Sequence, residues 1–224
     1  GILFRSVLGW AFAAVLGLAS VWVVRFFQFS NMTAGQITMG VVGFGGGWSH
    51  ALLIRRAGGH VSWKQSILLS AVWALTCIGA VTPLFFVLGT AWKMGLLTFY
   101  SFAAAGALGG VLTALATRPL FPDTCSRKVI PCALIWSVSL GVAAIGGDIL
   151  GNGLQTYLPP VVAWLVASGV LVLIIGCGGG FSIIRFLSVG EKEMGKSSIR
   201  PGTGARLSDS GQRNRLYFRT LILL

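Results

Sequence analysis

The sequence predicts an all-α integral membrane protein with six transmembrane helices, arranged as three tandem two-helix repeats. Of its 224 residues 55% are hydrophobic and only 10% are charged, and the mean hydropathy is +0.84. A soluble domain is roughly 45–50% apolar and about 25% charged. The apolar residues also form long blocks. Nineteen uncharged residues separate Arg5 from Arg25, which as a helix is enough to cross a hydrocarbon core of about 30 Å.

Five further apolar blocks of similar length follow the first, and together the six define a transmembrane domain over residues 1–186. Pro159 and Pro160 suit the start of the last helix, because proline is tolerated where the backbone N–H has no partner inside the helix. The predicted spans are Ser6–Val24, Ile37–Ile54, Ser66–Leu88, Leu96–Thr117, Val129–Ile149 and Pro160–Ile184.

The basic residues predict the orientation of the chain. The formal net charge is +12, which in a soluble protein would suggest a nucleic-acid partner. Here the 17 Lys and Arg lie almost entirely between apolar blocks and after the last one. With six spans and a cytoplasmic N-terminus, only Arg25 and Lys93 fall outside the cell. The positive-inside rule therefore predicts that both termini are cytoplasmic, and no nucleic acid is expected as a partner.

Residues 187–224 differ sharply in composition from the preceding domain, since Ser, Gly, Lys and Arg replace the apolar residues. Such a segment cannot bury enough apolar surface to fold alone, so we expect a largely disordered cytoplasmic tail up to about Arg215. Its basic residues are expected to be drawn to anionic lipid headgroups by about 1 kcal/mol each.

A shift of 63 residues aligns the second and third blocks with the fourth and fifth. The same shift places Trp10, Trp73 and Trp136 at equal intervals on the odd-numbered helices, where we expect them to pack in the core. A third copy aligns if the outer loop before Pro159 has gained seven residues. This spacing predicts three two-helix units of the same orientation. The aligned pairs include Gly43 with Gly106, Gly46 with Gly109, Gly47 with Gly110, Ala51 with Ala114, Arg55 with Arg118 and Ala80 with Ala143.

Each even-numbered span contains a GxxxG motif. Glycines four residues apart lie on one helix face and allow a second backbone to approach closely. We expect these faces to bring the second, fourth and sixth helices together around a solid centre, whereas Gly17 is expected to face lipid. The alternative is that the glycines leave room for a flat ligand or an ion path. The helix-packing residues are Gly43, Gly47, Gly106, Gly110, Gly176 and Gly180.

Only two ionisable side chains lie within the spans, His50 and Asp148. His50 is a possible ligand for a metal or a pigment, but an interfacial, hydrogen-bonded histidine is the favoured interpretation. Asp148 is a possible cation ligand, but its glycine-rich surroundings favour a residue that caps or ends its helix at the outer surface. Transport of ions normally needs more intramembrane charge than this.

No constellation of catalytic residues is apparent, so we do not expect an enzyme. Ser49 and His50 are adjacent on a helix and point about 100° apart, which does not give the contact between nucleophile and base of a serine hydrolase. The four cysteines form no CxxC pair. These residues predict no metal site and identify no cofactor.

The pattern GxxGGxxxALxxR, followed by a helix with a tryptophan, resembles uncharacterised Gly-rich multipass membrane proteins of bacteria, including photosynthetic ones. The resemblance covers Gly43 to Ala143 and implies no activity. The sequence favours a non-catalytic membrane subunit or scaffold, with other membrane subunits or a second copy of the chain as partners. The alternative is a channel or transporter for a small neutral solute, because such a pore needs few charges.

Overall fold

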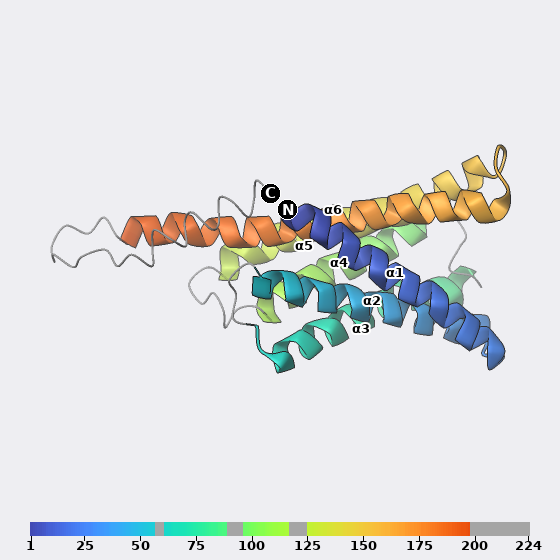
Figure 1. The fold of residues 1–224 in the computed structure, drawn as a ribbon, viewed down its shortest axis with the longest axis horizontal. Coiled ribbons are helices and arrows are strands. Elements are labelled where there is room, and N and C mark those ends of the chain that lie inside the picture. Colours follow the sequence, from blue (N-terminus) through green and yellow to red (C-terminus); the bar gives the residue numbers. More distant parts are fainter. Residues whose placement is uncertain (57–60, 89–95, 117–124, 198–224) are drawn as a thin grey trace.

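The computed structural model describes residues 1–56, 61–88, 96–116 and 125–197 (Figure 1). All regular structure in these segments is helical, and each helix contains a stretch long and apolar enough to span a membrane. The predicted fold class, an all-α membrane protein with six spans, is therefore confirmed. The helices are α1 (Ile2–Phe26), α2 (Asn31–Arg56), α3 (Trp63–Leu88), α4 (Leu96–Ala116), α5 (Cys125–Leu154) and α6 (Pro160–Ser197).

The six helices form a closed ring. Each helix packs against the next one along the chain, and α6 packs back against α1. The N-terminus of α1, the C-terminal end of α2 and the start of α3 lie at the same end of the bundle as the C-terminal half of α6 (Figure 1). Side-chain hydrogen bonds join neighbours in the ring: Ser101 Oγ on α4 donates to the Ala80 carbonyl on α3 over 2.5 Å, and Gln36 Nε2 on α2 donates to Thr82 Oγ1 on α3 over 3.0 Å.

Local signals set several helix ends. α3 follows a capping box, in which the Ser62 N–H donates to Gln65 Oε1 (2.8 Å) and the Gln65 N–H donates to Ser62 Oγ (3.3 Å). This exchange satisfies two backbone groups that a helix start otherwise leaves unpaired. The Thr33 N–H likewise donates to Ser30 Oγ before α2. α6 begins at Pro160, as predicted.

Two predicted helix ends are wrong. α5 continues past Asp148 to Leu154, so Asp148 does not end its helix. α6 continues to Ser197, past its predicted end at Ile184, and the division into a transmembrane domain over 1–186 and a largely disordered tail over 187–224 stays a prediction. The change to charged residues does not end the helix, because Glu and Lys are themselves good helix formers. Residues 198–224, the rest of the expected tail, lie outside the described residues.

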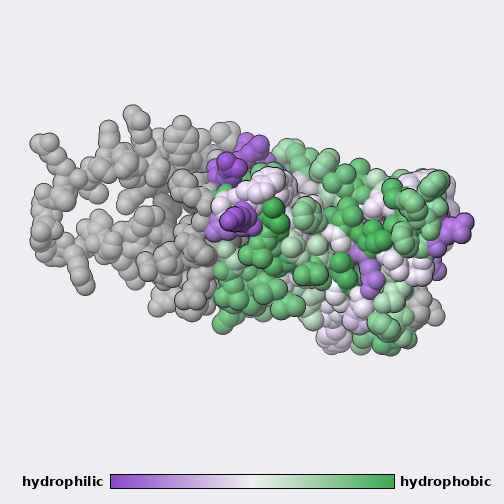
Figure 2. All heavy atoms as spheres, turned by 90° about the horizontal axis from the view of Figure 1, so that it is seen from below, coloured by the Kyte–Doolittle hydropathy of each residue, from purple (hydrophilic) through white to green (hydrophobic). Residues whose placement is uncertain are grey.

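Large apolar side chains cover the flanks of the bundle. Trp22 is 79% exposed, and Phe26, Phe86 and Tyr157 are also strongly exposed. Figure 2 shows a largely apolar flank, with the most hydrophilic residues mainly toward the two ends. In water such a surface would be a liability, whereas in a bilayer it is in contact with acyl chains. The arrangement agrees with the six predicted spans.

Candidate functional site: the bundle axis and its glycine faces

Three tryptophans, one from each odd-numbered helix, meet inside the ring. The ring centroids of Trp10 and Trp73 lie 5.8 Å apart, those of Trp10 and Trp136 lie 5.7 Å apart, and those of Trp73 and Trp136 lie 4.2 Å apart. Their exposed fractions are 3%, 0% and 0%. Ring pairs at such spacings contribute about 0.5–1.5 kcal/mol beyond their burial. The prediction that these residues pack in the core is confirmed.

Each of these indole rings lies against a glycine of the following helix. The benzene edge of Trp10 contacts Gly46, that of Trp73 contacts Gly109, and that of Trp136 contacts Gly179. A Cβ at Gly109 would lie 3.0 Å from Trp73 Cη2, and one at Gly179 would lie 3.1 Å from Trp136 Cη2. An added side chain at any of these glycines would therefore displace a central tryptophan.

The GxxxG glycines lie on a different face of the same helices and contact backbone. A Cβ at Gly43 would meet the Trp73 carbonyl oxygen, and one at Gly106 would meet the Trp136 carbonyl oxygen. The second glycine of the motifs on α2 and α4 behaves likewise: a Cβ at Gly47 would lie 2.8 Å from Leu69 O, and one at Gly110 would lie 2.7 Å from Cys132 O. Because backbone cannot move aside as a flexible side chain can, these positions have no room for a larger residue.

The helix pairing expected for these glycines is wrong. Gly43 and Gly47 face α3, Gly106 and Gly110 face α5, and α6 packs its glycines on α1. The even-numbered helices do not pack together at the centre, since α2 and α6 barely touch and other even-numbered pairs contact less. The physical reason is that the tryptophans of the odd-numbered helices fill the centre, so each glycine face is left to the neighbouring odd helix.

The contact between α6 and α1 is displaced along the helix axis relative to the other two. A Cβ at Gly47 would lie 2.8 Å from Ser70 Cα, and Val7 aligns with Ser70 under the 63-residue shift. On α6, however, it is Gly176 that lies against Val7, with 2.5 Å between its Cβ position and Val7 Cα, while Gly180 lies against Leu3. α6 is therefore displaced by about one turn where it closes the ring.

Gly17 does not face lipid as expected, and the structure buries it. A Cβ there would meet the Val42 side chain on α2. By contrast, a Cβ at Gly79 or Gly169 would have nothing within 4 Å. These two positions, and Gly146 and Gly153 on α5, are open in the way that was expected of Gly17.

His50 lies inside the bundle, only 2% exposed, with its ring centroid 5.7 Å from that of Trp136. Its Nδ1 has no hydrogen-bond partner among the described residues. The structure thus encloses the imidazole inside the bundle, and its interpretation as an interfacial, hydrogen-bonded histidine stays a prediction. His50 is buried because the small residues around it on α2 let that helix approach its neighbours, so that the imidazole is enclosed between them.

The axis holds further polar atoms that the sequence did not single out. Ser6 Oγ, Trp73 Nε1 and Trp136 Nε1 are buried and, within the described segments, have no hydrogen-bond partner. Leaving such a group unpaired costs about 1–3 kcal/mol. Ser6 is one turn before Trp10 on the same face of α1, and this spacing is the signal that could have identified it.

Asp148 is only 8% exposed, and its Oδ1 accepts a hydrogen bond of 3.0 Å from Asn152 Nδ2. The same amide donates to the Asp148 carbonyl oxygen. The helix thus continues through Asp148 with its carboxylate held by the next turn. No group of three or more His, Cys, Asp or Glu that could hold a metal ion occurs in the part of the chain that the structure describes.

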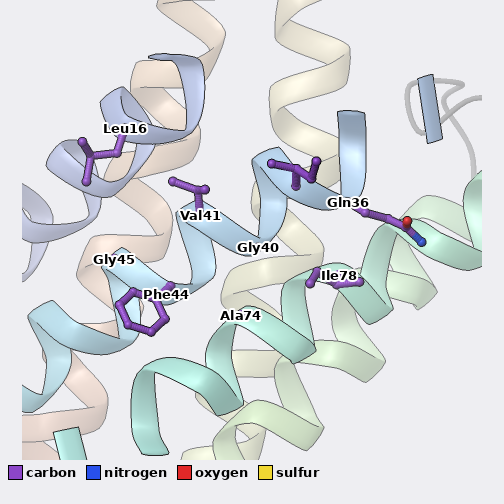
Figure 3. Close-up of a pocket in the computed structure, with 9 residues that line it drawn as sticks. Leu16, Gln36, Gly40, Val41, Phe44, Gly45, Ala74 and Ile78 are labelled. Atoms are coloured by element: carbon purple, nitrogen blue, oxygen red, sulfur yellow. The ribbon is translucent and has the colours of Figure 1, made fainter. Parts of the chain in front are cut away.

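An apolar groove of about 500 Å³ runs along α2 between α1 and α3 (Figure 3). Phe44 and Ile78 border it, Gly40 and Gly45 form part of its floor, and Gln36 lies at one end. Its residues offer apolar contact and one amide but no charge.

The geometry therefore combines a tightly packed aromatic axis with apolar grooves on the outside. His50 and Asp148 are not brought together, since one lies beside Trp136 and the other is held by Asn152. The six predicted packing glycines line three helix contacts rather than one shared centre. Comparisons of the chain with protein-family models, with curated proteins and with solved structures give no match.

Proposed function

We propose that this chain is a non-catalytic integral membrane subunit or scaffold. The observation that carries the proposal is the contact of Trp10, Trp73 and Trp136 on the axis of a closed helix ring. Aromatic rings in mutual contact fill the space that a solute path would need. The glycine faces then lock the helices through backbone contact, which favours one rigid arrangement.

We infer that the domain is built from three tandem two-helix units. The recurring contacts of Trp10 with Gly46, Trp73 with Gly109 and Trp136 with Gly179 support it, because they follow the 63-residue shift and its seven-residue extension. Equivalent contacts in each unit are what an internal repeat requires. The displaced contact between α6 and α1 is the place where the third unit departs from the other two.

We propose that both termini are cytoplasmic. The start of α1, the end of α2, the start of α3 and the C-terminal half of α6 lie at one end of the bundle (Figure 1). These segments carry Arg5, Arg55, Arg56, Lys64 and Arg185. The positive-inside rule assigns that end to the cytoplasm. Attraction of the tail to anionic headgroups remains a prediction, and residues 198–224 lie outside the described residues.

The partners we propose are other membrane subunits or a second copy of the chain. The support is the extent of exposed apolar surface on the flanks, including the groove of Figure 3, whose lining carries no charged residue.

The second candidate function is a channel or transporter for a small neutral solute. One observation favours it: Ser6, His50, Trp73 and Trp136 place polar atoms in the interior that have no hydrogen-bond partner in the described segments. Polar groups buried in a bundle often mark a route for polar guests. Against this candidate, the aromatic contacts leave such a route blocked unless a tryptophan moves.

Purification of the full chain in a mild detergent, followed by mass analysis of the intact particle, tests the proposal. A scaffold is expected to retain stable protein partners or to form a defined oligomer. Reconstitution into liposomes supplies the second measurement. Rapid entry of a small neutral solute such as glycerol, compared with protein-free liposomes, would contradict the scaffold proposal and favour the transporter.

A further inference from the structure

A second apolar groove, of about 910 Å³, runs between α5 and α6 on the outside of the bundle. Val138 and Leu173 form part of its walls, and Phe181 lies between them and Arg185 at one end. Gly178 has no side chain, so Ser139 packs directly against α6 in the floor. The volume falls in the range of about 300–1,000 Å³ typical of ligand clefts.

The length of this groove corresponds to one leaflet of a bilayer. At a rise of about 1.5 Å per residue, Leu173 and Arg185 are separated by about 18 Å along α6. Half of a hydrocarbon core of about 30 Å is about 15 Å. An acyl chain lying in the groove therefore runs from near the bilayer midplane to the level at which a headgroup begins.

Charge distinguishes this groove from the one between α1, α2 and α3. Arg185 is exposed at its end, and an arginine at this depth can extend its guanidinium to the interface while its methylenes stay in the apolar region. The groove of Figure 3 has no charged residue in its lining, and its polar end is the uncharged amide of Gln36. A guanidinium pairs with a phosphate through two parallel hydrogen bonds, which a glutamine cannot do.

We propose that the groove between α5 and α6 binds an anionic phospholipid, with one acyl chain along Val138 and Leu173 and the headgroup phosphate at Arg185. The lipid is selected by headgroup charge and held by apolar contact. This inference is independent of the scaffold proposal, because either a scaffold or a transporter can hold such a lipid.

The test is retention of lipid by the delipidated full-length chain in mild detergent. Phosphatidylglycerol and phosphatidylcholine with identical acyl chains are added in equal amounts, and native mass spectrometry measures the bound fraction of each. The wild-type chain is expected to prefer phosphatidylglycerol. Because one basic residue near a membrane contributes about 1 kcal/mol, Arg185→Gln is expected to reduce the preference about fivefold. Arg185→Lys keeps the charge and should keep most of the preference.

Matched variants distinguish lipid binding in the groove from attraction of anionic lipid to exposed basic residues in general. Arg56→Gln removes an exposed cation from the same end of the bundle and should leave the preference unchanged. Val138→Trp fills the groove at a residue that is 59% exposed, so both lipids should be retained less. Ile37→Trp, in the groove of Figure 3, should have no such effect. An equal loss of preference in Arg185→Gln and Arg56→Gln, or full retention by Val138→Trp, would overturn the proposal.

Discussion

The indole rings of Trp73 and Trp136 lie 4.2 Å apart between centroids, with their planes at 52°, and both side chains are fully buried. They belong to α3 and α5, which are not neighbours in the ring of helices. Their contact therefore crosses the interior and joins two helices that are not neighbours in the ring. The first prediction concerns this contact.

Trp136→Ala should lower the free energy of unfolding by about 3–5 kcal/mol, because it leaves a cavity where the ring touches Trp10, Trp73 and His50. Thermal unfolding in detergent measures the loss. Trp22→Ala is the matched control, since that ring is 79% exposed and faces lipid. Equal losses in the two variants would show that the axial contact does not stabilise the bundle.

Gly47→Leu and Gly110→Leu should each lower thermal stability clearly, because the new side chains would collide with the backbone of α3 and α5. Overpacking of this kind typically costs about 1–3 kcal/mol, and more when backbone must move. Gly79→Leu is the control, since a Cβ there meets nothing within 4 Å. The opposite outcome, normal unfolding with altered solute flux in liposomes, would favour the pore interpretation.

His50→Leu should leave thermal stability unchanged or raise it. The buried Nδ1 has no partner among the described residues, and an apolar side chain of similar size removes the cost of burying it, about 1–3 kcal/mol. Asn152→Leu provides the contrast, because it removes a formed hydrogen bond to Asp148 and should destabilise. Clear destabilisation by His50→Leu would mean that the imidazole is hydrogen-bonded to water or to a guest in the membrane.

Labelling of introduced cysteines, compared with the same background without them, tests the proposed orientation. On a Cys125→Ser background, a membrane-impermeant maleimide added outside intact cells should label a cysteine at Gln155 and miss one at Gly58. The distribution of basic residues gives this expectation. Labelling after the membrane is permeabilised confirms that both positions react. The reverse pattern in intact cells would invert the topology.

Ser62→Ala should destabilise the start of α3 by about 1 kcal/mol, because it removes one half of the capping box with Gln65. Hydrogen exchange of the first turn of α3, measured by mass spectrometry, should accelerate. Ser62→Asp retains a side-chain acceptor and should restore protection. Unchanged exchange in Ser62→Ala would indicate that packing alone holds this helix end.

The sequence by itself determined the six helices and that they span a membrane. Backbone groups cannot remain unpaired in hydrocarbon, so long apolar blocks separated by charged segments form helices that span the membrane. The equal spacing of Trp10, Trp73 and Trp136 also marked the residues that meet in the core. Helix ends such as those beyond Asp148 and Arg185 were less predictable, because helix formation continues through polar residues of good propensity.

Only the tertiary structure decided what each helix face contacts. A glycine face permits close approach of any backbone and does not choose between partners, so Gly47 and Gly110 could equally have met other even-numbered helices. The volume of the three tryptophans determines which helix each glycine face contacts. The indole rings occupy the centre, so each glycine face packs against an odd-numbered neighbour. The burial of His50 follows from this packing of residues distant in the sequence, which local patterns do not encode.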